Sequence, residues 1–330
     1  MYRTFPKLSL IHFTCTLFFL IVSVSHAQIH KFAELSVADI QALDRANTVV
    51  IIPGGLFEEH GPYLPVFTDG YSNEWMSQKV AEAIVEQTHR KVLMFPTIPL
   101  GAGSPEDFGG RKPFSGSYTV RPSTLRAVFM DLASAIGEDG FRWIFIIHGH
   151  GATSHNRSLL EASQYFKDTY GGSMIPLTAY SYSIKREQSK IWISEEKQEN
   201  AGDIHAGANE TSRILFLHPK LVDKEFRFAP PQTAPTSDHF SILAEKKEWP
   251  GYFGSPRIAS AKAGAIIMRR KVENLIDLAL KILKGFDVTS LNHWGKITNE
   301  SGENAYMNQC RRSAELEIKQ NDWLESRGLK

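Results

Sequence analysis

The sequence is poor in cysteine, with only Cys15 and Cys310 in its 330 residues. Two cysteines exclude a disulfide framework and any cysteine-rich zinc module. An excess of either charge is also lacking, because 37 Lys and Arg residues face 36 Asp and Glu residues. This balance lacks the excess of basic residues that is typical of proteins that bind nucleic acid. The remaining composition, 42% hydrophobic and 22% charged, is that of a globular protein and argues against disorder, collagen and coiled coil.

Long apolar runs are absent apart from one near the N-terminus. Two basic residues precede an apolar run at 13–24, and Ser25-His26-Ala27 places small residues three and one before Gln28. This three-part pattern is typical of a secretory signal peptide, and a retained membrane anchor is the alternative. We expect residues 1–27 to be removed. The mature protein would then be periplasmic or secreted, with no stable membrane anchor and with Cys310 as its only cysteine.

Short apolar, β-rich runs alternate with helical patterns along the rest of the chain. The expected strands are continuous apolar runs, as in strands buried on both faces: Thr48–Ile52, Val92–Phe95, Trp143–Ile147 and Met174–Ala179. Apolar residues at steps of three and four predict helices over 125–136, ending at Gly137 and Gly140, and over 267–282, ending at Gly285. The alternation predicts a mostly parallel α/β sheet, whose sites form beyond the carboxyl ends of its strands.

The loop after the first expected strand contains Glu58, Glu59, His60 and Asp69. Alternate side chains of an extended segment point the same way, so Glu58 and His60 can face one point while Glu59 faces away. Asp69 can return to that point at the start of the next helix. Carboxylate and imidazole together suit zinc, manganese or iron. A charged surface loop is the alternative interpretation.

The third expected strand runs directly into His148-Gly149-His150-Gly151. A histidine at the carboxyl end of a buried strand faces the place where ligands bind, which favours a functional role for His150. His155 is interpreted as an ordinary surface histidine.

A third polar loop, at 201–219, contains His205 and Glu210 just before a short helical run. We expect Asn209 or Thr211 to cap that helix. Taken alone, Glu210 could equally be a first-turn acid stabilised by the helix dipole.

Taken together, the three loops resemble those of the creatininase (creatinine amidohydrolase) family. PGGLFEEHGPYLPVFTD is similar to the family's opening signature, E-x-H-G-P-x-L-P running to an Asp. IIHGHG is similar to its strand ending in Asn-Gly-His-Gly, and HAGANETS to its His-Ala-Gly…Glu-Thr-Ser segment. The resemblance covers residues from about 47 to about 285. It implies a three-layer α/β/α fold with a mostly parallel sheet, a dinuclear metal site and often a hexamer.

The resemblance also implies roles for individual residues. The positions that match the family's metal ligands are Glu58, His60, Asp69 and His150, with Asp69 as the bridge between two divalent ions. Glu210 is the motif-matched carboxylate that could complete the second metal site, and His205 matches a catalytic histidine. We expect zinc paired with zinc, manganese or iron.

Three departures from the family pattern weaken the expectation that creatinine itself is the substrate. Ala152 stands where creatininase has a Glu, and His148 where relatives usually carry Asn. His148 is expected either to contact substrate or to alter metal affinity. The polar segment Ser181–Asn200 shows no counterpart of the tryptophans that creatininase places around its substrate.

These observations predict a metal-dependent amidohydrolase that cleaves a C–N bond, other than a peptide bond, in a small cyclic or linear amide. A metal-bound hydroxide would attack the carbonyl, and His205 would protonate the leaving nitrogen. Lactone hydrolysis and non-catalytic metal or ligand binding are the alternatives, and Ala152 favours the second of them.

The expected domain organisation is a leader at 1–27, a hydrolase domain at 28–286 and a C-terminal helical extension at 287–330. The extension has apolar residues that we expect to pack on the body or on a neighbouring subunit: Leu316, Ile318, Trp323 and Leu324.

Overall fold

The protein is described by a computed structural model, which covers residues 28–110, 115–180, 191–296 and 299–330. The expected leader lies outside the described residues, as does the 181–190 part of the segment that departs from the family pattern. A five-stranded parallel sheet forms the centre, in the order β1-β3-β2-β4-β5. Its strands are β1 (Ile29–Lys31), β2 (Thr48–Pro53), β3 (Lys91–Met94), β4 (Trp143–Ile147) and β5 (Ser173–Pro176).

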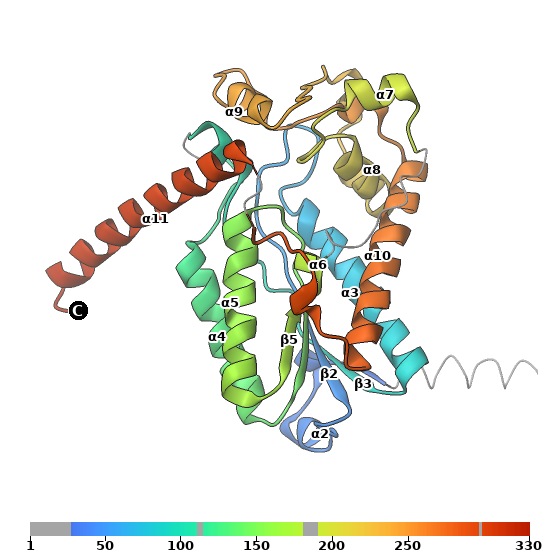
Figure 1. Cartoon of the computed structure of the whole chain (residues 1–330), viewed down its shortest axis with the longest axis vertical. Coiled ribbons are helices and arrows are strands. Elements are labelled where there is room, and N and C mark those ends of the chain that lie inside the picture. Colours follow the sequence, from blue (N-terminus) through green and yellow to red (C-terminus); the bar gives the residue numbers. More distant parts are fainter. Residues whose placement is uncertain (1–27, 111–114, 181–190, 297–298) are drawn as a thin grey trace, which may run out of the picture.

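Helices cover both faces of the sheet, which confirms the expected three-layer α/β/α fold (Figure 1). The α-helices of the described residues are α2 (Val37–Gln41), α3 (Thr68–Thr88), α4 (Pro122–Glu138), α5 (Thr153–Tyr170), α6 (Leu177–Tyr180), α7 (Ser194–Glu199), α8 (Ala208–Leu217), α9 (Asp238–Ala244), α10 (Ala261–Leu283) and α11 (Glu300–Ser326). The 3-10 turns are η1 (Phe32–Glu34), η2 (Pro105–Gly109), η4 (Pro219–Leu221), η5 (Lys224–Phe228), η6 (Pro256–Ile258) and η7 (Val288–Ser290). None of the helices in the described ranges is long and apolar enough to cross a membrane.

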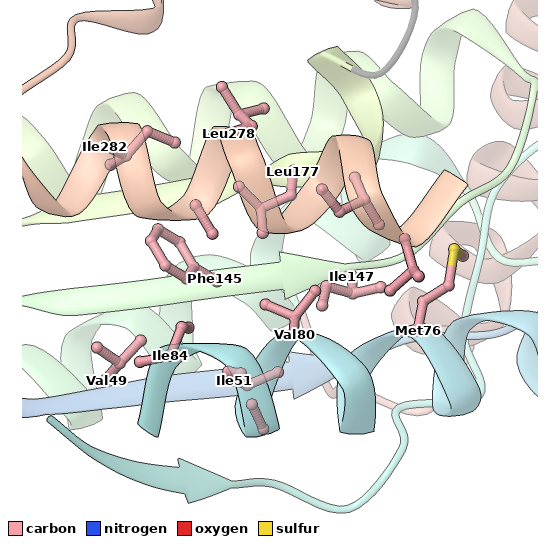
Figure 2. Close-up of a cluster of buried hydrophobic side chains, with 14 of the residues drawn as sticks. Val49, Ile51, Met76, Val80, Ile84, Phe145, Ile147, Leu177, Leu278 and Ile282 are labelled. Carbon is pink, nitrogen blue, oxygen red and sulfur yellow. The ribbon is translucent and has the colours of Figure 1, made fainter. Parts of the chain in front are cut away.

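The alternation of side chains along the central strands builds two cores. Val49 and Ile51 of β2 point to the face covered by α3 and α10, while Val50 and Ile52 point to the face covered by α4 and α5. Figure 2 shows the first of these cores, with Phe145 of β4 packed between side chains of the two covering helices. Because both faces are buried, the strands are apolar throughout, as their sequence indicated.

The strand order places a topological switch at β2 and β4, which lie side by side at the centre of the sheet. The chain leaves β2 into α3 on one face and leaves β4 into α5 on the opposite face. The loops after the two strands therefore diverge and leave a crevice at their carboxyl ends, which is the usual ligand site of such sheets.

Most expected elements are present, and two differ. β2, β3 and β4 lie within one residue of their predicted bounds, and α4 and α10 end where the glycines indicated. The predicted strand over Met174–Ala179 is wrong beyond Pro176, because the chain turns there into α6. β1 was not predicted: it is an edge strand of three residues, too short for a periodic pattern.

The C-terminal extension contains α11, whose first half packs on the body and whose second half projects from it (Figure 1). Ile318 and Trp323 on the projecting half are 61% and 55% exposed, whereas Leu316 is 38% exposed and lies beside Arg121 of the body. The expectation of packing on the body of the same chain is wrong for Ile318 and Trp323, since α11 is longer than the surface beneath it. A neighbouring subunit remains the other part of that prediction.

Candidate metal centre

The loop after β2 turns two of the predicted ligands into the protein. The loop passes very close to the end of β4: a Cβ on Gly54 would lie 2.1 Å from Cγ of His148. It closes on itself where the Glu58 N–H donates to the Val66 carbonyl at 3.0 Å. Glu58 and His60 are each 1% exposed, so the alternative of a charged surface loop is wrong for them.

The loop after β4 is held from the side by α3. Asn73 brackets Gly149, accepting its N–H at 3.0 Å and donating to its carbonyl at 3.3 Å. The bracket brings His150 against carboxylates from the other loop, with Nδ1 at 3.3 Å from both Glu58 Oε2 and Asp69 Oδ2. Asp69 lies in the first turn of α3, as its position in the sequence predicted.

The third loop positions Glu210 through a strained turn. Ala206 adopts a left-handed φ of 51°, which is uncommon for a residue with a side chain. The turn aims the Ala206 N–H at Glu210 Oε2, at 2.6 Å, while the other carboxylate oxygen pairs with the buried guanidinium of Arg213. Glu210 is therefore fixed from both sides and points at His60, whose Nε2 lies 3.5 Å away.

The six predicted site residues meet in one buried cluster. Their ligand atoms form three groups in which all atoms lie within 4.8 Å of one another: Glu58, Asp69 and His150; His60, Asp69 and Glu210; and Glu58, His60 and His205. Asp69 belongs to two groups, and so do Glu58 and His60. Two neighbouring cation positions that share a carboxylate fit this arrangement.

Several buried atoms in the cluster have no hydrogen-bond partner. They are both carboxylate oxygens of Glu58, Nε2 of His60 and Nε2 of His150. Nδ1 of His60 lies 3.1 Å from the Glu58 carbonyl and donates to it, which leaves Nε2 with a lone pair. Buried polar atoms without partners are costly, and cations held between these side chains would satisfy the Glu58 oxygens and Nε2 of His60. The residues present thus fit a metal centre.

Opposite charges inside the cluster shift the pKa values of Asp69, His150 and Glu210. Burial raises the pKa of Asp69, but its hydrogen bond with His150 and the charge of His60 outweigh this and hold that pKa well below its ordinary range. Burial lowers the pKa of His150, whereas the charges of Glu58 and Asp69 raise it well above the usual value. Burial also raises the pKa of Glu210, and the guanidinium of Arg213 more than reverses the effect.

Two histidines near the centre serve packing instead of contacting the crevice. His148 is fully buried, and its Nε2 donates to the Gly55 carbonyl at 3.0 Å, so the expectation of a contact with substrate is wrong. Burial lowers the pKa of His148 to about 3, and the ring is neutral. The interpretation of His155 as a surface histidine is also wrong: it is fully buried, edge-on to His148 with ring centroids 4.3 Å apart.

The prediction for the helix cap in the third loop was wrong. α8 begins at Ala208 with Gly207 as its N-cap, so Asn209 and Thr211 lie inside the helix. Asp203 from the preceding loop accepts the Asn209 N–H at 2.8 Å and takes the capping role. The sequence did not indicate this, because Asp203 lies outside the local capping pattern.

Sequence reasoning also missed the residues that hold the predicted ligands. Arg213 stands three residues after Glu210, a spacing that favours an ion pair on a helix. Asn73 stands four residues after Asp69, on the same face of α3. Both spacings are visible in the sequence. They become informative only once Glu210 and Asp69 are known to be candidate metal ligands.

An all-parallel α/β/α protein with carboxylates and imidazoles gathered at the carboxyl edge of its sheet belongs to the class of α/β proteins with a candidate metal centre at that edge. Within that class the family model described as creatinine amidohydrolase matches residues 33–279, and the chain belongs to the creatininase family. It is therefore a hydrolase of a metal-dependent family.

Relatives of two kinds are similar to the chain. Creatinine amidohydrolase of Pseudomonas putida is 25% identical over 237 residues, covering 70% of this chain and 88% of that protein. A mycofactocin precursor peptide peptidase of Mycobacterium tuberculosis is 25% identical over 265 residues, covering 76% and 92%. Among solved structures, a manganese creatininase has a TM-score of 0.58 at 22% identity, covering 76% of this chain and 98% of its own. That likeness supports the shared fold.

Proposed function

We propose that the protein is an amidohydrolase that uses two divalent metal ions to cleave the C–N bond of a small cyclic or linear amide. The observation that carries this proposal is the sharing of Asp69 between two groups of ligand atoms in a largely buried cluster. Glu58 and His150 would complete one metal position, and His60 and Glu210 the other. Zinc paired with zinc, manganese or iron suits these nitrogen and oxygen donors.

Metal ions bound by these residues would polarise the substrate carbonyl and lower the pKa of water to near neutrality. The buried surroundings of Glu58, His60 and Asp69 strengthen the charge interactions among these side chains. Arg213 holds Glu210 in place, and Asn73 holds the loop of His150. Fixed ligands spare the site from reorganising during the reaction.

His205 is the proposed proton donor to the leaving nitrogen. Its ring lies against that of His60, with centroids 4.4 Å apart, and its Nδ1 is 4.0 Å from Glu210 Oε2. Burial lowers the pKa of His205, but the charges of Glu58, Glu59 and Glu210 outweigh it and raise that pKa to about 10. A protonated imidazole at the edge of the centre suits a general acid.

Peptide-bond hydrolysis is the second candidate. The relatives named as peptide peptidases match as much of this chain as the creatinine amidohydrolase does, at similar identity. Both reactions attack a carbonyl carbon and release a nitrogen, so one metal centre could perform either. The walls of the crevice would decide which amide enters.

Metal content and substrate preference test the proposal. The purified mature protein is expected to retain about two metal ions per chain, and His150→Ala to lower that number. It is then assayed against creatinine and other lactams, linear amides, short peptides and matched lactones. Turnover of lactams or amides supports the first candidate, and turnover of peptides alone the second. Turnover of lactones alone, or bound metal without any turnover, would contradict both.

We also propose that the mature protein is exported and assembles as a homo-oligomer, with a hexamer suggested by the family resemblance. The leader pattern at 1–27 supports export. The exposed Ile318 and Trp323 on the projecting half of α11 provide apolar surface for a neighbouring copy. Light scattering of the mature chain, alone and with both residues changed to Ser, tests the assembly, and a monomer in both cases would contradict it.

A further inference from the structure

Glu59 is a buried carboxylate that the metal centre does not use. It belongs to none of the three groups of candidate ligand atoms found in the described residues, although Glu58 and His60 on either side belong to them. Its side chain is 6% exposed. A charged group held so deep in the protein needs partners, because removing it from water is costly.

The surroundings hold the Glu59 carboxylate in one orientation. Its Oε2 accepts the Gly61 N–H at 2.8 Å, and its own N–H donates to Ser117 Oγ at 3.1 Å. A Cβ on Gly251 would lie 2.3 Å from the same Oε2, and Gly251 has a φ of 88°, so a glycine leaves the room that this carboxylate fills. With Oε2 engaged, Oε1 is left without a hydrogen-bond partner.

The free oxygen faces His205. Nε2 of His205 lies 3.4 Å from Glu59 Oε1 and 2.8 Å from the Glu59 carbonyl oxygen. Both oxygens are acceptors, so Nε2 carries a proton and donates it toward Glu59. Nδ1 is then the ring nitrogen that faces the centre, on the side of Glu210.

We propose that Glu59 is a positioning residue: its carboxylate and carbonyl together hold Nε2 of His205, so that Nδ1 is the atom that exchanges a proton with the substrate. This inference rests on the proposed role of His205 as proton donor. A carboxylate that orients a histidine and selects its tautomer is a general device for such groups. The hydrogen bonds place this carboxylate on the side of the ring away from the metal ligands, which explains why Glu59 faces away from them.

Glu59→Gln is the sharpest test, because Gln has the same shape but only one acceptor oxygen. The Gly61 N–H and the His205 Nε2–H then compete for that oxygen. The donor that does not reach the oxygen faces the amide NH₂, which cannot accept a hydrogen bond from it. We expect kcat to fall by about 10- to 100-fold, with the number of bound metal ions unchanged and KM little affected. Glu59→Ala, which leaves a small cavity instead of a misplaced donor, provides a second variant if the Gln variant folds poorly.

The position of protons on the His205 ring can be measured without any assay of activity. This measurement separates the inference from the proposed function. In zinc-loaded protein with ¹⁵N-labelled histidine, long-range ¹H–¹⁵N correlation spectra, assigned with His205→Gln, are expected to show a proton on Nε2 of His205. The Glu59 variants are expected to change the His205 pattern and leave those of His60 and His150 unchanged. Glu161→Gln, which breaks an exposed ion pair with Arg126, is the control and should change neither kcat nor the spectra.

The outcomes are distinct. A His205 pattern that is identical in the wild-type protein and both Glu59 variants, or a wild-type Nε2 that carries no proton, would overturn the positioning role. Unchanged kcat in both variants would do the same. If the wild-type protein turns over no substrate, the proposed function fails, and the ring spectra still decide whether Glu59 orients His205.

Discussion

Asp69 connects the two halves of the candidate centre, since one carboxylate lies within reach of both groups of ligand atoms. Asp69→Asn keeps the shape and removes the charge that two cations would share. We expect bound metal to fall from about two ions to one or fewer, and hydrolysis to fall by at least about 10³-fold, because metal ions contribute several kcal/mol to such reactions. Metal analysis and kcat/KM measure these effects. Asp139→Asn, which removes an exposed partner of Arg45, should leave both unchanged.

His150 makes metal binding depend on pH. A metal ion needs the unprotonated ring, but neighbouring carboxylates raise the pKa of His150 well above its usual value in the metal-free protein. Metal binding near neutral pH must therefore displace a proton. We expect apparent zinc affinity to rise about tenfold per pH unit for each displaced proton, up to the pKa of the metal-free ring. Calorimetry in buffers of different ionisation enthalpy measures the proton release, and an affinity independent of pH would contradict the expectation.

Gly70 is required beside Asp69 because the ring of Phe67 lies across it. A Cβ on Gly70 would lie 2.2 Å from that ring. We expect Gly70→Ala to lower the free energy of unfolding by about 1–3 kcal/mol. In a Phe67→Ala background the same change should be neutral or stabilising, because Ala is more favourable than Gly inside a helix by about 1 kcal/mol. Urea unfolding of the four proteins gives the coupling, and equal effects of Gly70→Ala in both backgrounds would exclude the steric explanation.

At the scale of elements, α11 lies wholly beyond the residues matched by the family model. Its first half reaches the loops around the site. Gln309 is buried and pairs with Ser154 in the first turn of α5, and Asn308 donates to the Asp107 carbonyl of η2 at 2.8 Å. A Cβ on Gly103 would lie within 3.1 Å of both the Ala152 side chain and the Gln309 amide, so this helix meets the loop of His150.

We expect Gln309→Ala to lower the free energy of unfolding by about 1–3 kcal/mol, since it leaves buried polar groups without a partner. Ile318→Ser on the projecting half of the same helix is the matched control and should lie within about 0.5 kcal/mol of the wild type when the chain is monomeric. Denaturant unfolding at low protein concentration measures both. Equal effects of the two substitutions would contradict the division of α11 into a packed and a projecting half.

At the scale of the whole molecule, we propose that removal of residues 1–27 produces the functional chain. We expect expression of the full sequence in an exporting bacterial host to yield a mature protein that begins at Gln28. Intact-mass measurement of the periplasmic and membrane fractions checks this. A Ser25→Arg and Ala27→Arg double variant removes the small residues at the cleavage point and should accumulate as the uncleaved, membrane-associated precursor. An uncleaved wild-type chain in the membrane fraction would support the anchor instead.

Much of the fold could be predicted because its signals are local. Continuous apolar runs located β2, β3 and β4, and glycines located the ends of α4 and α10. Predictions failed where local signals compete or are short. Met174–Ala179 is apolar enough for a longer strand, yet the chain turns at Pro176, and the three residues of β1 carry no periodicity.

The sequence by itself determined the positions of β2, β3 and β4 and the residues that stand at the carboxyl ends of β2 and β4. Those properties follow from side-chain spacing along one segment. Only the tertiary structure decided which of these side chains touch. Glu59 meets His205 across 146 residues, and Ser154 meets Gln309 across 155. Contacts at such separation depend on strand order, on loop paths and on the packing of α11, none of which a local pattern encodes.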